Sequence, residues 1–217
     1  MRTWIALLWC AIGVLAVGTT HAAPEATADD DGLAVLRAYL DGLDTFSAAF
    51  RQQVVSRDLE PIEDARGRVV LKKPGRFRWD YAEPYERVIS ADGERVWLYE
   101  ADLDQVTVRR LDAGLGETPA ALLTGTADVL DHFHYRGSMV SGDVRWLRLE
   151  PEAAESDFAA IELGFVGGDL QGILLMDRLG QKTKIDFDDV DTETAVADDL
   201  FRFEPPPGVD VIDENEL

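Results

Sequence analysis

The first regular pattern along the chain is a run of large apolar residues spaced three or four positions apart, which is the spacing of one helix face. Its members are Leu33, Leu36, Leu40, Leu43, Phe46 and Phe50. Charged residues such as Arg37 and Asp41 fall between them and would lie on the opposite face. The pattern predicts an amphipathic helix over Leu33–Val54, whose apolar side covers another apolar surface.

Beyond this segment the pattern changes to alternation with a period of two, which is typical of strands with one face buried and one in water. Charged and aromatic residues alternate in Arg76–Tyr81, and charged and apolar residues alternate in Lys182–Asp188. Further strand candidates are Arg66–Leu71, Arg87–Ala91, Arg95–Tyr99, Gln105–Leu111, His132–Arg136, Val144–Glu150, Ala159–Phe165 and Gly172–Asp177. These segments predict a protein made mainly of strands.

Glycine-containing turns separate most of these strands, and the pair Asp92-Gly93 joins two apolar runs as a tight hairpin. Similar turn signals lie at Gly142, Gly167, Gly168 and Gly180. Such short connections build an antiparallel meander, which a short helix over Thr118–Thr124 interrupts. About nine or ten strands are too many for a flat sheet, so the sequence predicts a mainly β (α+β) fold bent into a partial barrel under the amphipathic helix.

The N-terminus has the three-part pattern of a cleaved signal peptide: a positive charge at Arg2, an apolar run over Ile5–Val17, and small residues after it. This run is too short for a permanent membrane-spanning helix. We expect a signal peptide over residues 1–22, a flexible mature N-terminus over residues 23–31 and a single domain over residues 32–217. A retained anchor is the alternative; lipid attachment at Cys10 is disfavoured, because this residue lies inside the apolar run.

The chain is strongly acidic, with 42 acidic and 21 basic residues and a formal net charge of −21 at pH 7. Nucleic acid and anionic lipid head groups are therefore poor partners, because binding them requires a basic surface. The single cysteine leaves with the signal peptide, so disulfide bonds cannot stabilise the mature fold.

Candidate catalytic groups are sparse. His132 and His134 would share one face of a strand and could begin a metal site, but spacing fixes no third ligand. An orientation of both histidines toward solvent fits the pattern equally well. The sequence also lacks a Gly-x-Ser-x-Gly nucleophile motif, a complete calcium loop and a dinucleotide fingerprint. It therefore predicts no enzyme, no catalytic residue, no metal site and no cofactor.

Large aromatic residues are concentrated in the predicted strands. They are Phe77, Trp79, Tyr81, Trp97, Tyr99 and Trp146. Each alone is typical of a packed core. As a set they favour an apolar cavity, because a curved sheet under a helix encloses more volume than its side chains fill.

Four segments resemble, in order and spacing, the periplasmic outer-membrane lipoprotein carrier (LolA) family. They are Thr45–Gln52, Gly67–Trp79, Ser90–Tyr99 and Phe201–Val209. The resemblance extends over nearly the whole mature length. It implies an unclosed, strongly curved antiparallel β-barrel with a helical lid. It also implies a periplasmic chaperone that carries acylated lipoproteins from an inner-membrane ABC transporter to an outer-membrane receptor.

Combined with the apolar pattern, the resemblance implies an acyl-chain cavity and a latch for the lid. The cavity residues would be Leu36, Leu40, Leu43, Phe77, Trp79, Tyr81, Ile89 and Trp97. The latch would be Lys73, close to Leu40; the family usually has an arginine at this position, and lysine keeps its charge but offers fewer donors. We expect a monomer. The alternatives are a carrier or sensor of the same fold for another lipid, such as a glycolipid, and a protein-binding module.

Overall fold

The computed structural model describes residues 30–111, 119–124, 127–154 and 156–216, so the predicted signal peptide and most of the predicted flexible N-terminus lie outside the described residues. Its strands are β1 (Thr45–Val55), β2 (Pro61–Lys72), β3 (Arg76–Glu83), β4 (Arg87–Asp92), β5 (Arg95–Glu100), β6 (Gln105–Arg110), β7 (Phe133–Ser141), β8 (Val144–Pro151), β9 (Phe158–Val166), β10 (Asp169–Asp177), β11 (Lys182–Asp191) and β12 (Asp210–Asp213). Its helices are α1 (Asp30–Gly42) and α3 (Pro119–Thr124), with short 3-10 helices η1 (Ala101–Leu103), η2 (Ala127–His132), η3 (Asp198–Phe201) and η4 (Glu214–Glu216). None of these described helices has the length and apolar character needed to cross a membrane.

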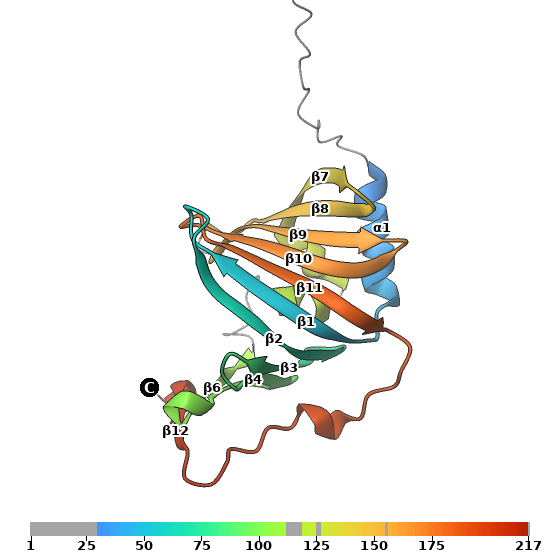
Figure 1. Ribbon diagram of the computed structural model, residues 1–217. Coiled ribbons are helices and arrows are strands. Elements are labelled where there is room, and N and C mark those ends of the chain that lie inside the picture. Colours follow the sequence, from blue (N-terminus) through green and yellow to red (C-terminus); the bar gives the residue numbers. More distant parts are fainter. Residues whose placement is uncertain (1–29, 112–118, 125–126, 155, 217) are drawn as a thin grey trace, which may run out of the picture.

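The described strands form one 12-stranded sheet in the order β12-β6-β5-β4-β3-β2-β1-β11-β10-β9-β8-β7. Neighbouring strands run antiparallel, except for the parallel pair of β12 and β6. β12 and β7 lie at the two edges, so the sheet is strongly curved but unclosed, with α1 and α3 on its concave side (Figure 1). The structure confirms the predicted mainly β, unclosed fold.

The helix predicted over Leu33–Val54 is wrong in its second half. α1 ends at Gly42, and the chain continues as β1. Phe46 and Phe50 are four residues apart, a spacing that fits both one helical turn and two repeats of a strand. Every second residue of β1 is buried, and the strand pairs with β2 on one side and β11 on the other. Long-range pairing therefore decides a segment whose local spacing is ambiguous.

The other predicted strands are confirmed, with bounds that shift by a few residues. The Asp92-Gly93 hairpin joins β4 to β5, and Gly93 has φ +102, a region that residues with a side chain rarely adopt. The short helix predicted over Thr118–Thr124 corresponds to α3, which is described from Pro119; Thr118 lies outside the described residues. The four-residue strand β12 was not predicted, because it is short and has an acidic residue at each end.

Apolar residues are buried on both faces of the sheet. The concave core joins inward side chains of the strands to those of α1, α3 and η2. A smaller outer cluster lies on the convex face of β4–β6, beneath the C-terminal segment that follows β11. Its residues are Val88, Trp97, Tyr99, Val106, Val108, Phe201 and Phe203. Ser90 of β4 connects the sheet to the C-terminal segment, because its Oγ donates to the Phe201 carbonyl at 3.0 Å.

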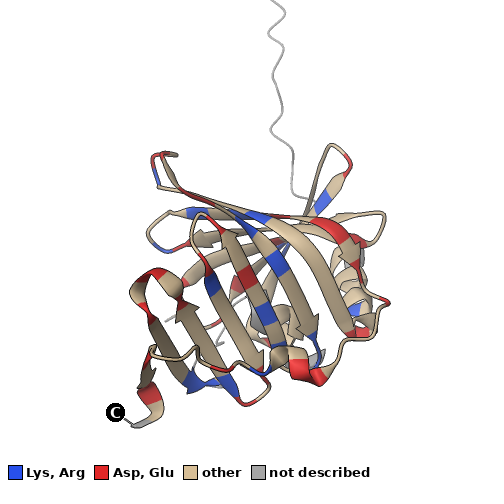
Figure 2. Ribbon diagram, turned by 60° about the horizontal axis from the view of Figure 1, so that its bottom comes forward, with Lys and Arg blue, Asp and Glu red and all other residues tan. Residues whose placement is uncertain are grey.

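Charged residues cover other parts of the convex face and pair across strands. Arg148 lies 2.9 Å from Glu162, and Arg51 lies 2.5 Å from Asp64. Figure 2 shows basic and acidic residues interspersed along the strands. This part of the sheet is a solvated surface, and such exposed pairs contribute little to stability.

Candidate functional site

The concave core is most apolar where α1 crosses it. Leu36 and Leu40 of α1 are 0% and 3% exposed, and Leu43, which directly follows the helix, is 4% exposed. Tyr39 of the same helix packs edge-on against Phe165 of β9, with ring centroids 5.1 Å apart. Each buried leucine stabilises the closed arrangement by about 1.5–3 kcal/mol. Movement of α1 would expose a continuous apolar surface.

An aromatic row follows β3 on the concave face. The Trp79 and Tyr81 rings lie 5.0 and 4.9 Å from the Phe50 ring, measured between centroids. Gly67 makes room for this row, because a Cβ atom there would lie 2.9 Å from the Phe50 ring and 1.9 Å from the Asp80 carbonyl oxygen. In this structure the aromatic residues pack against one another.

The turn between β2 and β3 contacts both helices. Lys73 Nζ donates to the Leu40 carbonyl in the last turn of α1, where a positive charge is favoured by the helix dipole. The Lys73 backbone N–H donates to the Asp44 carbonyl at 2.9 Å, and the Gly75 N–H donates to the Thr124 carbonyl at the end of α3 at 3.0 Å. Burial lowers the pKa of Lys73, and two nearby aspartates oppose this shift. One short turn therefore holds both helices.

Polar side chains occupy the concave face toward the rim opposite α1. The Tyr81 hydroxyl donates to Gln52 Oε1 at 3.1 Å, and both residues are 8% exposed. The Arg87 guanidinium lies 4.1 Å from the Tyr81 ring centroid, and one of its nitrogens lies 3.5 Å from a carboxylate oxygen of Glu63. Burial raises the pKa of Tyr81, although the positive charge of Arg87 acts in the opposite direction. Sequence reasoning missed this group because Gln52 fell within the predicted helix.

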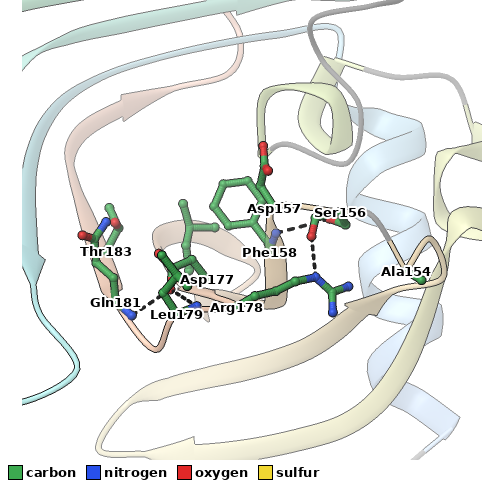
Figure 3. A pocket seen from close by; sticks show the side chains of 10 residues that line it. Ala154, Ser156, Asp157, Phe158, Asp177, Arg178, Leu179, Gln181 and Thr183 are labelled. Atoms are coloured by element: carbon green, nitrogen blue, oxygen red, sulfur yellow. Dashed lines mark hydrogen bonds between the residues drawn. The ribbon is translucent and has the colours of Figure 1, made fainter.

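A pocket of about 470 Å³ opens at the same rim, between the β8–β9 connection and the β10–β11 turn (Figure 3). Phe158 and Leu175 supply its apolar lining, and Thr183 of β11 lies on its other side. Arg178 reaches across the opening and donates from Nε to the Ser156 carbonyl at 2.5 Å. Its volume is in the range of small-molecule sites.

Most of the predicted cavity residues lie on the concave side. They are Leu36, Leu40, Leu43, Phe77, Trp79, Tyr81 and Ile89. The prediction of Trp97 as a cavity residue is wrong, because this residue pairs with Ser90 and Val108 and belongs to the outer cluster. Alternation along β5 turns Val96 inward and Trp97 outward. Both faces of this strand are apolar, so side-chain size does not show which face is concave.

Two further aromatic residues of the predicted set also lie on the convex face. Tyr99 packs against Phe203, with ring centroids 5.8 Å apart. Trp146 covers glycines of β9 and β10: a Cβ atom at Gly164 would lie 2.9 Å from its ring, and one at Gly172 would lie 3.6 Å away. The aromatic residues therefore serve two separate apolar layers.

The two histidines do not share a strand face. His132 closes η2, His134 belongs to β7, and both are exposed. Nδ1 of His134 lies 3.8 Å from a carboxylate oxygen of Glu152. Within the part of the chain that the structure describes, no group of three or more His, Cys, Asp or Glu residues could hold a metal ion.

Comparison with known proteins places these features in a family. Residues 41–204 match the family described as outer membrane lipoprotein carrier protein LolA. The outer-membrane lipoprotein carrier protein of Nitrosospira multiformis is 40% identical over 205 residues, which cover 93% of this chain and 94% of that protein. The corresponding protein of Chromohalobacter salexigens is 37% identical, with 92% and 96% covered.

The fold has a counterpart among solved structures. A crystal structure of an uncharacterized conserved protein from Thermus thermophilus matches with a TM-score of 0.52 and 14% identity, covering 85% of this chain and 98% of that one. This similarity concerns the fold alone. The sequence relatives and the family match show that the chain belongs to the LolA family of outer-membrane lipoprotein carrier proteins, which are not enzymes.

Proposed function

We propose that the protein is exported by its signal peptide and carries acylated lipoproteins through the periplasm, from an inner-membrane ABC transporter to an outer-membrane receptor. Membership of the carrier family supports the cargo class. The observation that carries the proposal is the concave core, an extended apolar face covered by two short helices that one turn holds in place.

The physical need for such a carrier follows from the cost of exposing acyl chains to water. Each methylene costs about 0.8 kcal/mol to hydrate, so a chain of about 16 carbons costs on the order of 12 kcal/mol. Full binding of three chains at that strength would exceed the practical limit of non-covalent affinity and prevent release. Displacement of packed side chains must therefore offset part of the binding energy.

In the described core, acyl chains would compete with packed side chains for the same apolar contacts. In the proposed cycle, acyl chains take the places of Leu36, Leu40 and Leu43 in the concave core, and they extend to Trp79 and the rest of the aromatic row. α1 then moves away, and its return assists release at the receptor. Lys73 acts as the latch in this cycle, because its hydrogen bond to Leu40 must break before α1 can leave.

Release of a triacylated lipoprotein from inner-membrane vesicles, with the transporter and ATP present, tests the proposal. The mature protein should move the lipoprotein into the soluble fraction. Retention of the lipoprotein in the membrane pellet, while an established carrier releases it in the same assay, would refute the function. Mass spectrometry of lipids bound to the protein from its own periplasm should find diacylglyceryl-cysteine protein; a glycolipid would support the alternative cargo.

A further inference from the structure

The concave face changes in character from one rim to the other. Near α1 it is apolar, whereas at the opposite rim polar side chains project inward from neighbouring strands. We call these residues the polar belt: Thr183 of β11, Gln52 of β1, Glu63 of β2, Tyr81 of β3 and Arg87 of β4. The register supports this placement, because Val54, two residues from Gln52 on the same face, pairs with Thr183 and with Glu63, and Tyr81 pairs with Arg87.

Several donors of this region are not used within the described part of the protein. Nε of Arg87 is buried and has no hydrogen-bond partner. The Thr183 hydroxyl and the Gln181 side-chain amide also make no hydrogen bond among the described residues. Both line the ≈ 470 Å³ pocket, whose residue Leu175 belongs to the concave core. The donors of Thr183 and Gln181 therefore face an opening that continues into the apolar core.

The charges around the opening limit the ligands that these donors can bind. Arg87 is balanced by Glu63, and the carboxylates of Asp157 and Asp177 lie at the pocket. A ligand with a phosphate would place a negative charge beside the carboxylates of Asp157 and Asp177. It would gain little from Arg178, the arginine in the pocket lining, because this side chain already donates to the Ser156 and Ala153 carbonyls. Uncharged carbonyl oxygens can accept the free hydrogen bonds without this repulsion.

We propose that the polar belt and its pocket bind the ester and amide carbonyl groups that join acyl chains to the N-terminal cysteine of a lipoprotein, and thereby discriminate against anionic phospholipids. This inference rests on the proposed function. It fixes the direction of the cargo: the acyl chains point toward α1, and the polypeptide leaves at the rim of the β1–β2 and β10–β11 turns. Figure 1 shows these two turns side by side, and Arg57 lies against Gly180 there.

The first test compares uptake of two ligands with the same acyl chains, a triacylated cysteine lipopeptide with an uncharged peptide and phosphatidylglycerol. Thr183→Val removes one donor at nearly constant volume. It should lower the affinity for the lipopeptide about fivefold, the effect of one hydrogen bond, and leave phosphatidylglycerol uptake unchanged. Thr192→Val, at an exposed threonine after the other end of β11, is the matched control and should change neither.

The second test reverses the discrimination. Glu63→Gln together with Asp157→Asn removes two negative charges with little change in shape, and should raise phosphatidylglycerol uptake relative to lipopeptide about tenfold. If Thr183→Val and the double variant both leave the ratio of lipopeptide uptake to phosphatidylglycerol uptake at the wild-type value, the polar belt does not bind the ester and amide carbonyl groups. Failure of the wild-type protein to take up any lipopeptide would instead refute the proposed function itself.

Discussion

Adjacent lysines hold two different covers on the two faces of this sheet. Lys73 donates to the Leu40 carbonyl of α1, which covers the concave core. Lys72 points to the convex side, where Nζ lies 2.6 Å from the Val196 carbonyl and 2.5 Å from the Asp198 carboxylate. Each lysine fixes one segment over one apolar layer, but the rest of the attachment differs between the two covers.

The C-terminal cover is joined to the sheet by backbone bonds as well as side chains. β12 extends the sheet beside β6, the Asp210 N–H donates to the Asp104 carbonyl at 2.9 Å, and Ser90 bonds to Phe201. α1 instead rests on the concave core through apolar side chains, with Lys73 at its end. Apolar contacts can be exchanged for acyl chains, whereas backbone pairing cannot. The comparison supports the proposal that α1 is a movable cover, whereas the C-terminal segment is a permanent one.

The largest expected effect is on the permanent cover. Phe201 is fully buried in the outer cluster, so Phe201→Ala should lower the free energy of unfolding by about 3–5 kcal/mol. Uptake of lipoprotein per folded molecule should stay at the wild-type level. Urea unfolding and the vesicle-release assay measure the two quantities; a parallel loss of uptake would mean that the two faces are coupled.

Two tryptophans offer the next comparison. Trp79→Ala removes a buried concave side chain, so the free energy of unfolding should fall by about 3–5 kcal/mol. Acyl-chain uptake per folded molecule should also fall, by about tenfold or more, because the acyl chains lose a large apolar contact. Trp97→Ala, the matched change in the outer cluster, should lower stability and leave uptake unchanged. Uptake per folded molecule at the wild-type level in Trp79→Ala would identify this residue as ordinary core.

A smaller effect is expected from the latch. Lys73→Leu should speed uptake and slow hand-off to the receptor, each by roughly two- to tenfold, the effect of one hydrogen bond, because less energy is needed to open the cover and less is gained when it closes. Lys73→Arg should shift both rates in the opposite direction. Lys72→Leu is the control, since it affects the other cover. Unchanged rates in both Lys73 variants would place the latch elsewhere.

The smallest effect concerns pH. The hydrogen bond from Lys72, assisted by Arg76, lowers the pKa of Asp198 below its ordinary value of 3.8. A lowered carboxyl pKa gives stability that is fully present above 3.8 and is lost as pH falls through the folded-state value. Asp198→Asn should therefore loosen the C-terminal segment at neutral pH as acid does in the wild type. Amide exchange around η3 measures this; identical exchange in both proteins at pH 7 would contradict it.

Strand positions could be read from the sequence wherever polar and apolar residues alternate, as in Arg76–Tyr81. The sequence did not determine the structure at two kinds of position. Phe46 and Phe50 have a spacing that fits helix and strand, and only pairing with β2 and β11 resolves it. Trp97 lies on a strand that is apolar on both faces, and its direction depends on the C-terminal segment that covers the convex side.

The candidate site shows the same division. The sequence placed the apolar residues of α1 and β3 together, and the structure places Lys73 at Leu40, where a contact was expected; its role as latch stays a prediction. The polar belt could not be anticipated, because Gln52 is 29 positions from Tyr81 in sequence, fell within the predicted helix and meets Tyr81 only through strand pairing.

Hydrogen exchange of backbone amides, measured with and without a triacylated lipopeptide, tests the central distinction between the two covers most directly. Binding should change protection in α1 and at the turn that contains Lys73, because acyl chains displace the helix from the concave core. Protection of the β6–β12 pair should stay as it is in the free protein. Unchanged protection in α1, or a loss of protection in β12 on binding, would contradict the account.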